Sequence, residues 1–130
     1  MELIQEHSTE IFILLFLIVT FLQSGIDKII DWKGNLEFIT GHFKNSPLKN
    51  MVPLLLLTIL VMETIAGVLM LVGVFQLLTT GESVFAFYGL SLANMSLIFL
   101  LIGQRLAKDY AGAMTLAVYF IIAALGLYIL

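Results

Sequence analysis

Residues 51–78 have the sequence MVPLLLLTILVMETIAGVLMLVGVFQLL, which contains one charged side chain, that of Glu63. A helix of about 20 mainly apolar residues is long enough to cross the hydrocarbon core of a bilayer. Pro53 falls in the first turn, where the missing N–H of proline removes no helical hydrogen bond. The stretch therefore predicts a transmembrane helix that begins near residue 51 and ends near residue 78.

Three further apolar stretches predict spans over about 11–32, 84–103 and 111–130. Hydrophobic residues make up 61% of the 130 residues and charged residues 12%, whereas soluble domains are about 45–50% apolar and ~25% charged. Backbone groups in hydrocarbon must be satisfied within the protein, and the alternating strand pattern of a barrel is absent from the sequence. We expect an all-α membrane protein, a four-helix transmembrane bundle that forms one domain over residues 1–130.

The connection between the first two spans, residues 27–50, interleaves apolar and charged side chains at roughly helical spacing. Trp32 is expected at headgroup depth, and Gly34 is expected to interrupt the helix. We interpret this connection as an amphipathic segment that lies at the membrane interface. An anchor that closes the bundle is the favoured role, and a functional lid or docking surface is the alternative.

The basic residues define the expected orientation. All six lie in the connections after the first and third spans: Lys28, Lys33, Lys44, Lys49, Arg105 and Lys108. The positive-inside rule assigns these connections to the cytoplasm and places both termini outside. The N-terminus lacks the basic region and cleavage site of a signal peptide, so the first span is expected to be retained.

Glu63 is the main candidate for a functional residue, because a carboxylate near the middle of a span costs several kcal/mol unless it is protonated or paired. Thr20, Asn94 and Tyr119 lie at similar depth on the other spans. A hydrogen-bonded cluster of these groups would serve as a ligand or proton site, or would only fix helix register. We favour the site, because Ser or Thr would fix register without a buried carboxylate.

A second polar group is expected at the cytoplasmic ends of the spans, formed by Lys28, Gln104, Arg105 and Asp109. Lys28 and Asp109 have opposite charges and are candidates to pair between helices. Interfacial anchoring is the favoured role of this group. The alternative is the polar mouth of a ligand pocket whose apolar floor lies under Glu63.

The remaining chemistry-bearing residues exclude several classes of function. His7 and His42 are predicted on opposite sides of the membrane, so they cannot share a metal or haem, and His42 is expected to be solvated. The chain has no cysteine, which excludes disulfides and cysteine-ligated metal sites. No catalytic motif, metal site or other cofactor site is evident, and six scattered basic residues indicate no nucleic-acid binding.

Three short segments resemble the DoxX family of four-span bacterial membrane proteins. They are Gly25-Ile26-Asp27-Lys28, the set formed by Pro53, Glu63, Gly67 and Gly73, and the run from Gly103 to Ala113. The resemblance implies a multi-pass protein of the bacterial inner membrane. The family includes a membrane subunit of a thiosulfate-oxidising, quinone-reducing enzyme, so the resemblance also implies proximity to quinone or redox chemistry. The residues that match the family are Lys28, Glu63, Arg105 and Asp109.

We therefore expect an accessory membrane subunit that binds a lipophilic, quinone-like molecule or docks a soluble or membrane redox partner. If the protein takes part in catalysis, it does so as a membrane subunit of a quinone-linked oxidoreductase. A small proton-linked transporter and a purely structural scaffold are the alternatives. Membrane lipid is an expected partner, and a homo-oligomer is compatible with the sequence.

Overall fold

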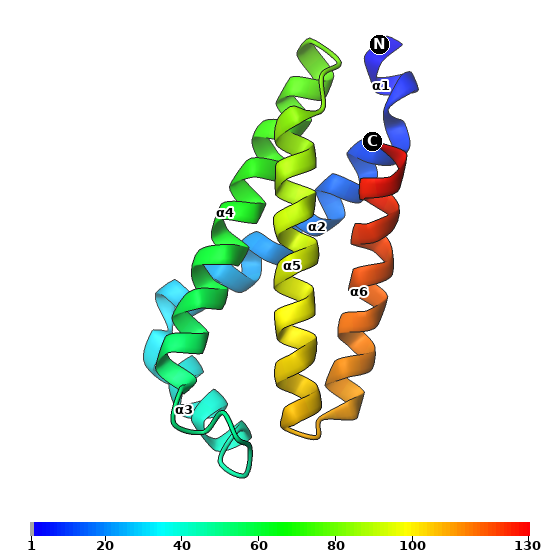
Figure 1. Ribbon diagram of the computed structural model, residues 1–130. Helices are drawn as coiled ribbons and strands as arrows, with labels where there is room; N and C mark the ends of the chain where they lie inside the picture. Colours follow the sequence, from blue (N-terminus) through cyan, green and yellow to red (C-terminus); the bar gives the residue numbers. More distant parts are fainter. Residues whose placement is uncertain (1) are drawn as a thin grey trace.

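The computed structural model of the protein describes residues 2–130, which form an all-helical bundle (Figure 1). A short N-terminal helix, α1, precedes four long helices, and a further short helix, α3, lies between the first two long ones. The helices are α1 (Glu2–Glu6), α2 (Ser8–Ile30), α3 (Trp32–His42), α4 (Val52–Thr79), α5 (Val84–Leu106) and α6 (Tyr110–Ile129).

Four helices, α2, α4, α5 and α6, are long and apolar enough to cross a membrane. The predicted four-helix transmembrane bundle is therefore confirmed, and the observed helices lie within three residues of the predicted span limits. Pro53 lies in the first turn of α4, as its position in the sequence predicted.

A first correction concerns the end of the first span, which was predicted to stay helical to about residue 32. α2 ends at Ile30, and the backbone turns at Asp31, whose carboxylate accepts a hydrogen bond from Gly34 N at 3.2 Å. This contact caps the N-terminus of α3. The helix is therefore interrupted at Asp31. The interruption was predicted at Gly34, but Gly34 lies in the first turn of α3.

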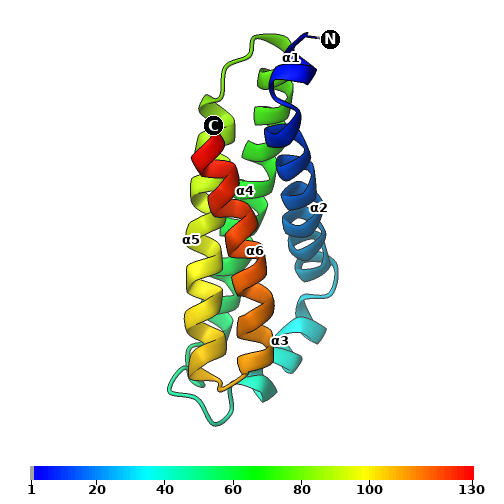
Figure 2. The ribbon, with the colours of Figure 1, turned by 90° about the vertical axis from the view of Figure 1, so that its right-hand side faces the viewer.

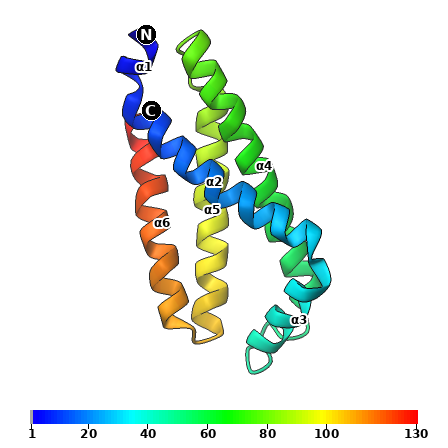
Figure 3. The same ribbon diagram turned by 180° about the vertical axis from the view of Figure 1, so that it is seen from behind.

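α4 packs along both α5 and α2, whereas α6 packs mainly against α5. α2 crosses the bundle obliquely, beside α6 near the chain termini and beside α4 near its own C-terminal end (Figure 3). The chain termini and the α4–α5 turn lie at one end of the bundle, and α3 lies at the other (Figure 2). We call the latter the α3 end.

The tightly packed core occupies the half of the bundle farther from the α3 end. Its buried side chains come from the first two thirds of α2, the second half of α4 and the first two thirds of α5, for example Leu14, Met70 and Leu90, with Ala123 from α6. Gly73 and Gly89 let α4 and α5 approach closely, since a Cβ at Gly73 would lie 2.6 Å from Ala86 N. Fewer side chains are buried in the half near α3, and α3 itself has no buried residue.

A tight turn joins α5 to α6 at the α3 end. Lys108 adopts a left-handed conformation with a φ of 62°, and the Asp109 N–H donates to the Gln104 carbonyl at 2.9 Å. This is the hydrogen-bond pattern of a Schellman motif, in which glycine is the usual left-handed residue. The turn places Asp109 directly beside Gln104, and the Asp109 carboxylate caps α6 by accepting from Gly112 N at 2.9 Å.

Candidate ligand site

Glu63 lies near the middle of α4 and is 4% exposed. Its partner is Lys28 of α2, whose Nζ lies 3.3 Å from Glu63 Oε2 and 2.6 Å from Ser24 Oγ. The buried carboxylate is thus paired with a cation from a neighbouring helix. Such pairing is the arrangement that membrane-embedded charges require.

Close contact between α2 and α4 brings these two side chains together. A Cβ on Gly25 would lie 2.8 Å from Thr64 Oγ1, so only glycine fits at this approach without displacement of a neighbour. Lys28 lies three residues after Gly25, and Glu63 directly precedes Thr64. The helix contact at Gly25 therefore sets the distance at which the ion pair forms.

The other residues predicted to cluster with Glu63 make contacts of their own. Asn94 Nδ2 donates to the Leu90 carbonyl at 2.7 Å within α5, and the Thr20 hydroxyl donates to the Phe16 carbonyl at 2.9 Å within α2. The Tyr119 ring packs 6.2 Å from that of Phe16, measured between centroids. Among the described residues no hydrogen bond joins these three side chains to Glu63, and their role as ligands stays a prediction.

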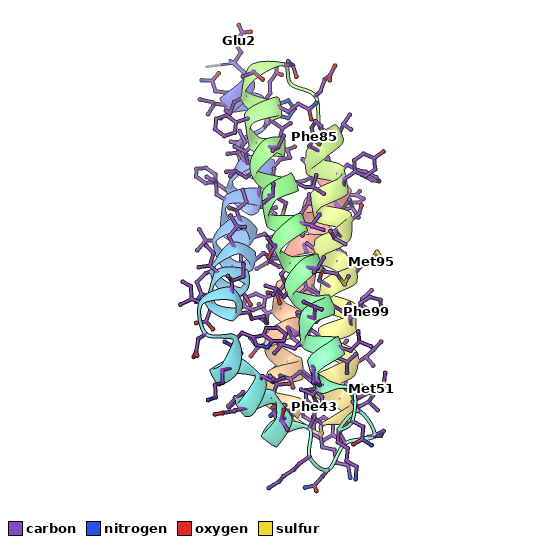
Figure 4. The ribbon with its side chains drawn as sticks, turned by 90° about the vertical axis from the view of Figure 1, so that its left-hand side faces the viewer. Glu2, Phe43, Met51, Phe85, Met95 and Phe99 are labelled. Atoms are coloured by element: carbon purple, nitrogen blue, oxygen red, sulfur yellow. The ribbon has the colours of Figure 1, made fainter. Side chains whose placement is uncertain are left out.

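A cavity of about 630 Å³ lies at the α3 end, between α3 and the adjoining halves of α4 and α5. We call it the α3 cavity. Its walls are largely apolar, and the side chains that form them include Phe38, Ile39, Phe43, Leu55, Leu56, Ile59, Phe99 and Leu100. Ile59 is one helical turn from Glu63, so the cavity begins close to the ion pair. Figure 4 shows Phe43 and Met51 at this end of the molecule and Phe85 at the other.

Polar groups from all sides of the bundle also line the α3 cavity. They are Lys28 from α2, Asn35 and His42 from α3, Thr58 from α4, Gln104 from α5 and Asp109 before α6. Lys28, Gln104 and Asp109 were predicted together as a polar mouth, and the structure does bring them to one cavity. Glu63 does not line the cavity itself, but it pairs with Lys28, which does.

Two predicted contacts in this region were wrong. Lys28 pairs with Glu63 and not with Asp109, whose Oδ2 lies 3.5 Å from His42 Nε2. His42 was expected to be solvated, yet its side chain is 22% exposed and its Nε2 lies 2.8 Å from Gln104 Oε1. The reason is the break at Asp31, which turns α3 back toward the bundle.

Arg105, the fourth residue of the predicted mouth, does not line the α3 cavity. Its guanidinium lies over the Tyr110 ring, 4.7 Å from the centroid. A cation–π contact of this kind joins the last turn of α5 to the first turn of α6. The role of Arg105 in anchoring stays a prediction.

Sequence reasoning missed the cavity-lining residues of α3. Asn35, Phe38, Ile39 and His42 are spaced at i, i+3, i+4 and i+7, so they share one helix face. That spacing was visible in the sequence and indicated an amphipathic helix. The direction of the face could not be read from it, because the face could equally have been turned toward lipid.

The fold and the site define a multi-pass membrane protein with a buried lysine–glutamate pair beside an apolar cavity. The family model described as DoxX matches residues 12–103, and the chain therefore belongs to the DoxX family. The resemblance noted in the three sequence segments is thus confirmed. No curated protein and no solved structure gave a significant match to the chain.

Proposed function

We propose that this DoxX-family protein is an accessory membrane subunit that binds a lipophilic, quinone-like molecule in the α3 cavity. The observation that carries the proposal is the cavity itself, which has about 630 Å³, apolar walls and a few polar groups. Small-molecule sites in proteins are typically clefts of ~300–1,000 Å³ with this kind of lining. A lipophilic tail would pack on the walls, and a polar head would face Lys28, His42 and Gln104.

The ion pair supports this proposal because it holds the Lys28 side chain in place. Of the three N–H donors of the ammonium group, one is directed to Ser24 Oγ and one to Glu63 Oε2. The third is available to an oxygen atom of a molecule in the cavity. Because Glu63 balances the positive charge of Lys28, the head group of the ligand does not have to be anionic.

The orientation in the membrane is part of the same proposal. Lys28, Arg105 and Lys108, with the other basic residues, lie at or near the α3 end, so this end would face the cytoplasm of a bacterial inner membrane. The chain termini would then lie outside. In this orientation the α3 cavity would be open to the cytoplasmic leaflet and to a redox partner docked beside it.

Native mass spectrometry of protein gently extracted from its own membrane tests the proposal. Leu100→Trp adds a bulky side chain to the wall of the α3 cavity, and Val61→Trp places the same side chain on an exposed face of α4. A small lipophilic molecule bound to the wild type and to Val61→Trp, and lost from Leu100→Trp, would support the cavity as the site. Equal retention by all three proteins, or bulk lipid alone on the wild type, would contradict it.

A flux assay distinguishes the alternative function, a proton-linked transporter, from that of an accessory subunit. In proteoliposomes a transporter would give a proton-coupled flux that Glu63→Gln abolishes. The accessory subunit is expected to give no such flux, and a redox protein is expected to co-purify with it. A flux that depends on Glu63 would therefore overturn the accessory role.

A further inference from the structure

His42 is held at the α3 cavity by contacts on one of its two ring nitrogens. Nε2 lies 2.8 Å from Gln104 Oε1 and 3.5 Å from Asp109 Oδ2. An ionised carboxylate can accept hydrogen bonds but cannot donate them. Two acceptors at one nitrogen place the proton of a neutral imidazole on Nε2, because the hydrogen-bond partner sets the tautomer.

The other ring nitrogen, Nδ1, then carries a lone pair that accepts a hydrogen bond. Within residues 2–130, the part of the chain that the structure describes, no protein group hydrogen-bonds to Nδ1. The ring is fixed by Phe38, stacked at 5.9 Å between centroids, and by Phe43, which meets it edge-on at 5.3 Å. All three side chains line the α3 cavity. The fixed His42 ring, with an acceptor that no described protein group uses, is therefore part of the cavity lining.

We propose that His42 Nδ1 accepts a hydrogen bond from a hydroxyl group of the molecule bound in the α3 cavity. The ligand class is an uncharged lipophile that carries a phenol-type O–H. This inference rests on the proposed ligand-binding function and makes it more specific. Of the two redox forms of a quinone-like molecule, the reduced form carries this hydroxyl and is the form that His42 favours.

The charges that face His42 support an uncharged head group. Asp109 Oδ2 lies 3.5 Å from His42 Nε2, and a phosphate or carboxylate placed at His42 would be repelled by this carboxylate. Lys28, which lines the same cavity, is already balanced by Glu63. An anionic lipid would therefore lack an unpaired cation in this cavity, whereas a hydroxyl group needs only an acceptor.

The test compares para-nonylphenol with its methyl ether, which has the same shape and no O–H. Binding of both probes to the purified protein in lipid nanodiscs is measured in the same buffer. The wild type is expected to bind the phenol about three- to tenfold more tightly than the ether, the range that one net hydrogen bond provides. His42→Phe is expected to bind the two probes equally, and His7→Phe, at the far end of the molecule, is expected to keep the preference.

A second measurement does not depend on the folding of a variant. The chain has two histidines, so nitrogen-15 NMR of histidine-labelled protein gives two assignable sets of ring resonances. The phenol is expected to shift the Nδ1 resonance of His42, while the ether leaves it in place and His7 responds to neither probe. An unchanged His42 Nδ1 resonance in phenol-saturated protein would overturn the inference.

The outcomes separate this inference from the proposed function. If neither probe binds the wild type, the ligand-binding function itself fails, and the inference falls with it. If both probes bind equally and Leu100→Trp displaces both, the cavity is a ligand site but the hydroxyl contact with His42 is wrong. A preference for the phenol that persists in a folded His42→Phe variant also overturns the inference.

Discussion

Breaking the Lys28–Glu63 pair is expected to destabilise the bundle more than the loss of one ordinary hydrogen bond. At the observed 3.3 Å, two unit charges attract by about 5 kcal/mol at an effective dielectric constant of ~20, and desolvation offsets much of this. Removal of one partner from a buried pair costs about 3–5 kcal/mol, because the other charge stays buried alone. The Lys28 side chain is 14% exposed, so water reaching it reduces the expected cost.

We expect Glu63→Gln to lower the free energy of unfolding by about 2 kcal/mol and Lys28→Gln by about 3 kcal/mol, since Lys28→Gln leaves the carboxylate without its cation. The double variant should lose about 2 kcal/mol less than the sum of the two, because it leaves no unpaired charge. The assay is equilibrium unfolding in mixed micelles of a mild detergent and sodium dodecyl sulfate, followed by circular dichroism. Thr20→Val is the control, because the exposed Thr20 hydroxyl bonds only its own helix. If the losses of the two single variants add in the double variant, with a coupling below about 0.5 kcal/mol, Lys28 is not the partner of Glu63.

The remaining predictions concern the elements that position the site. Gly73→Ala should destabilise the bundle by about 1–3 kcal/mol in the same assay, since the new Cβ meets the backbone of Ala86. Gly41→Ala, where a Cβ meets open space, should be neutral or stabilising. Equal effects of the two substitutions would contradict the close α4–α5 packing. Lys108→Gly should stabilise the bundle by up to about 1 kcal/mol, because glycine adopts its left-handed conformation without strain, and a loss would contradict that backbone geometry. Asp31→Ala should remove the cap of α3 at a local cost of about 1 kcal/mol, visible as faster hydrogen exchange in α3, and unchanged exchange would argue against the capping role.

The span pattern was predictable from the sequence because the bilayer leaves few choices. Long apolar stretches without paired strands can only be helices, and their limits follow from polar clusters at each end. Span ends were less predictable where short-range capping decides them. The carboxylate of Asp31 stops the first span three residues before Gly34, and a cap of this kind depends on local geometry that composition does not show.

The candidate site was predictable only in part. Glu63 stood out because a carboxylate inside a span needs a partner, and Lys28 stood out because of its place at the end of the first span. Their pairing depends on the crossing of α2 over α4 at Gly25, which is a property of three-dimensional packing. His42 was misjudged because its polar contacts come from the last turn of α5 and from the α5–α6 turn, far away in the sequence.

Photo-crosslinking tests directly whether a lipophilic molecule binds in the α3 cavity. The probe is a quinone analogue with a diazirine in its tail, activated in nanodiscs, and the crosslinked peptides are located by mass spectrometry. Crosslinks are expected within 35–43, 52–59 and 99–104, which line the cavity, and they should be lost in Leu100→Trp. Crosslinks spread over exposed residues of α6, such as Met114 and Val118, and unaffected by Leu100→Trp would contradict binding in the cavity.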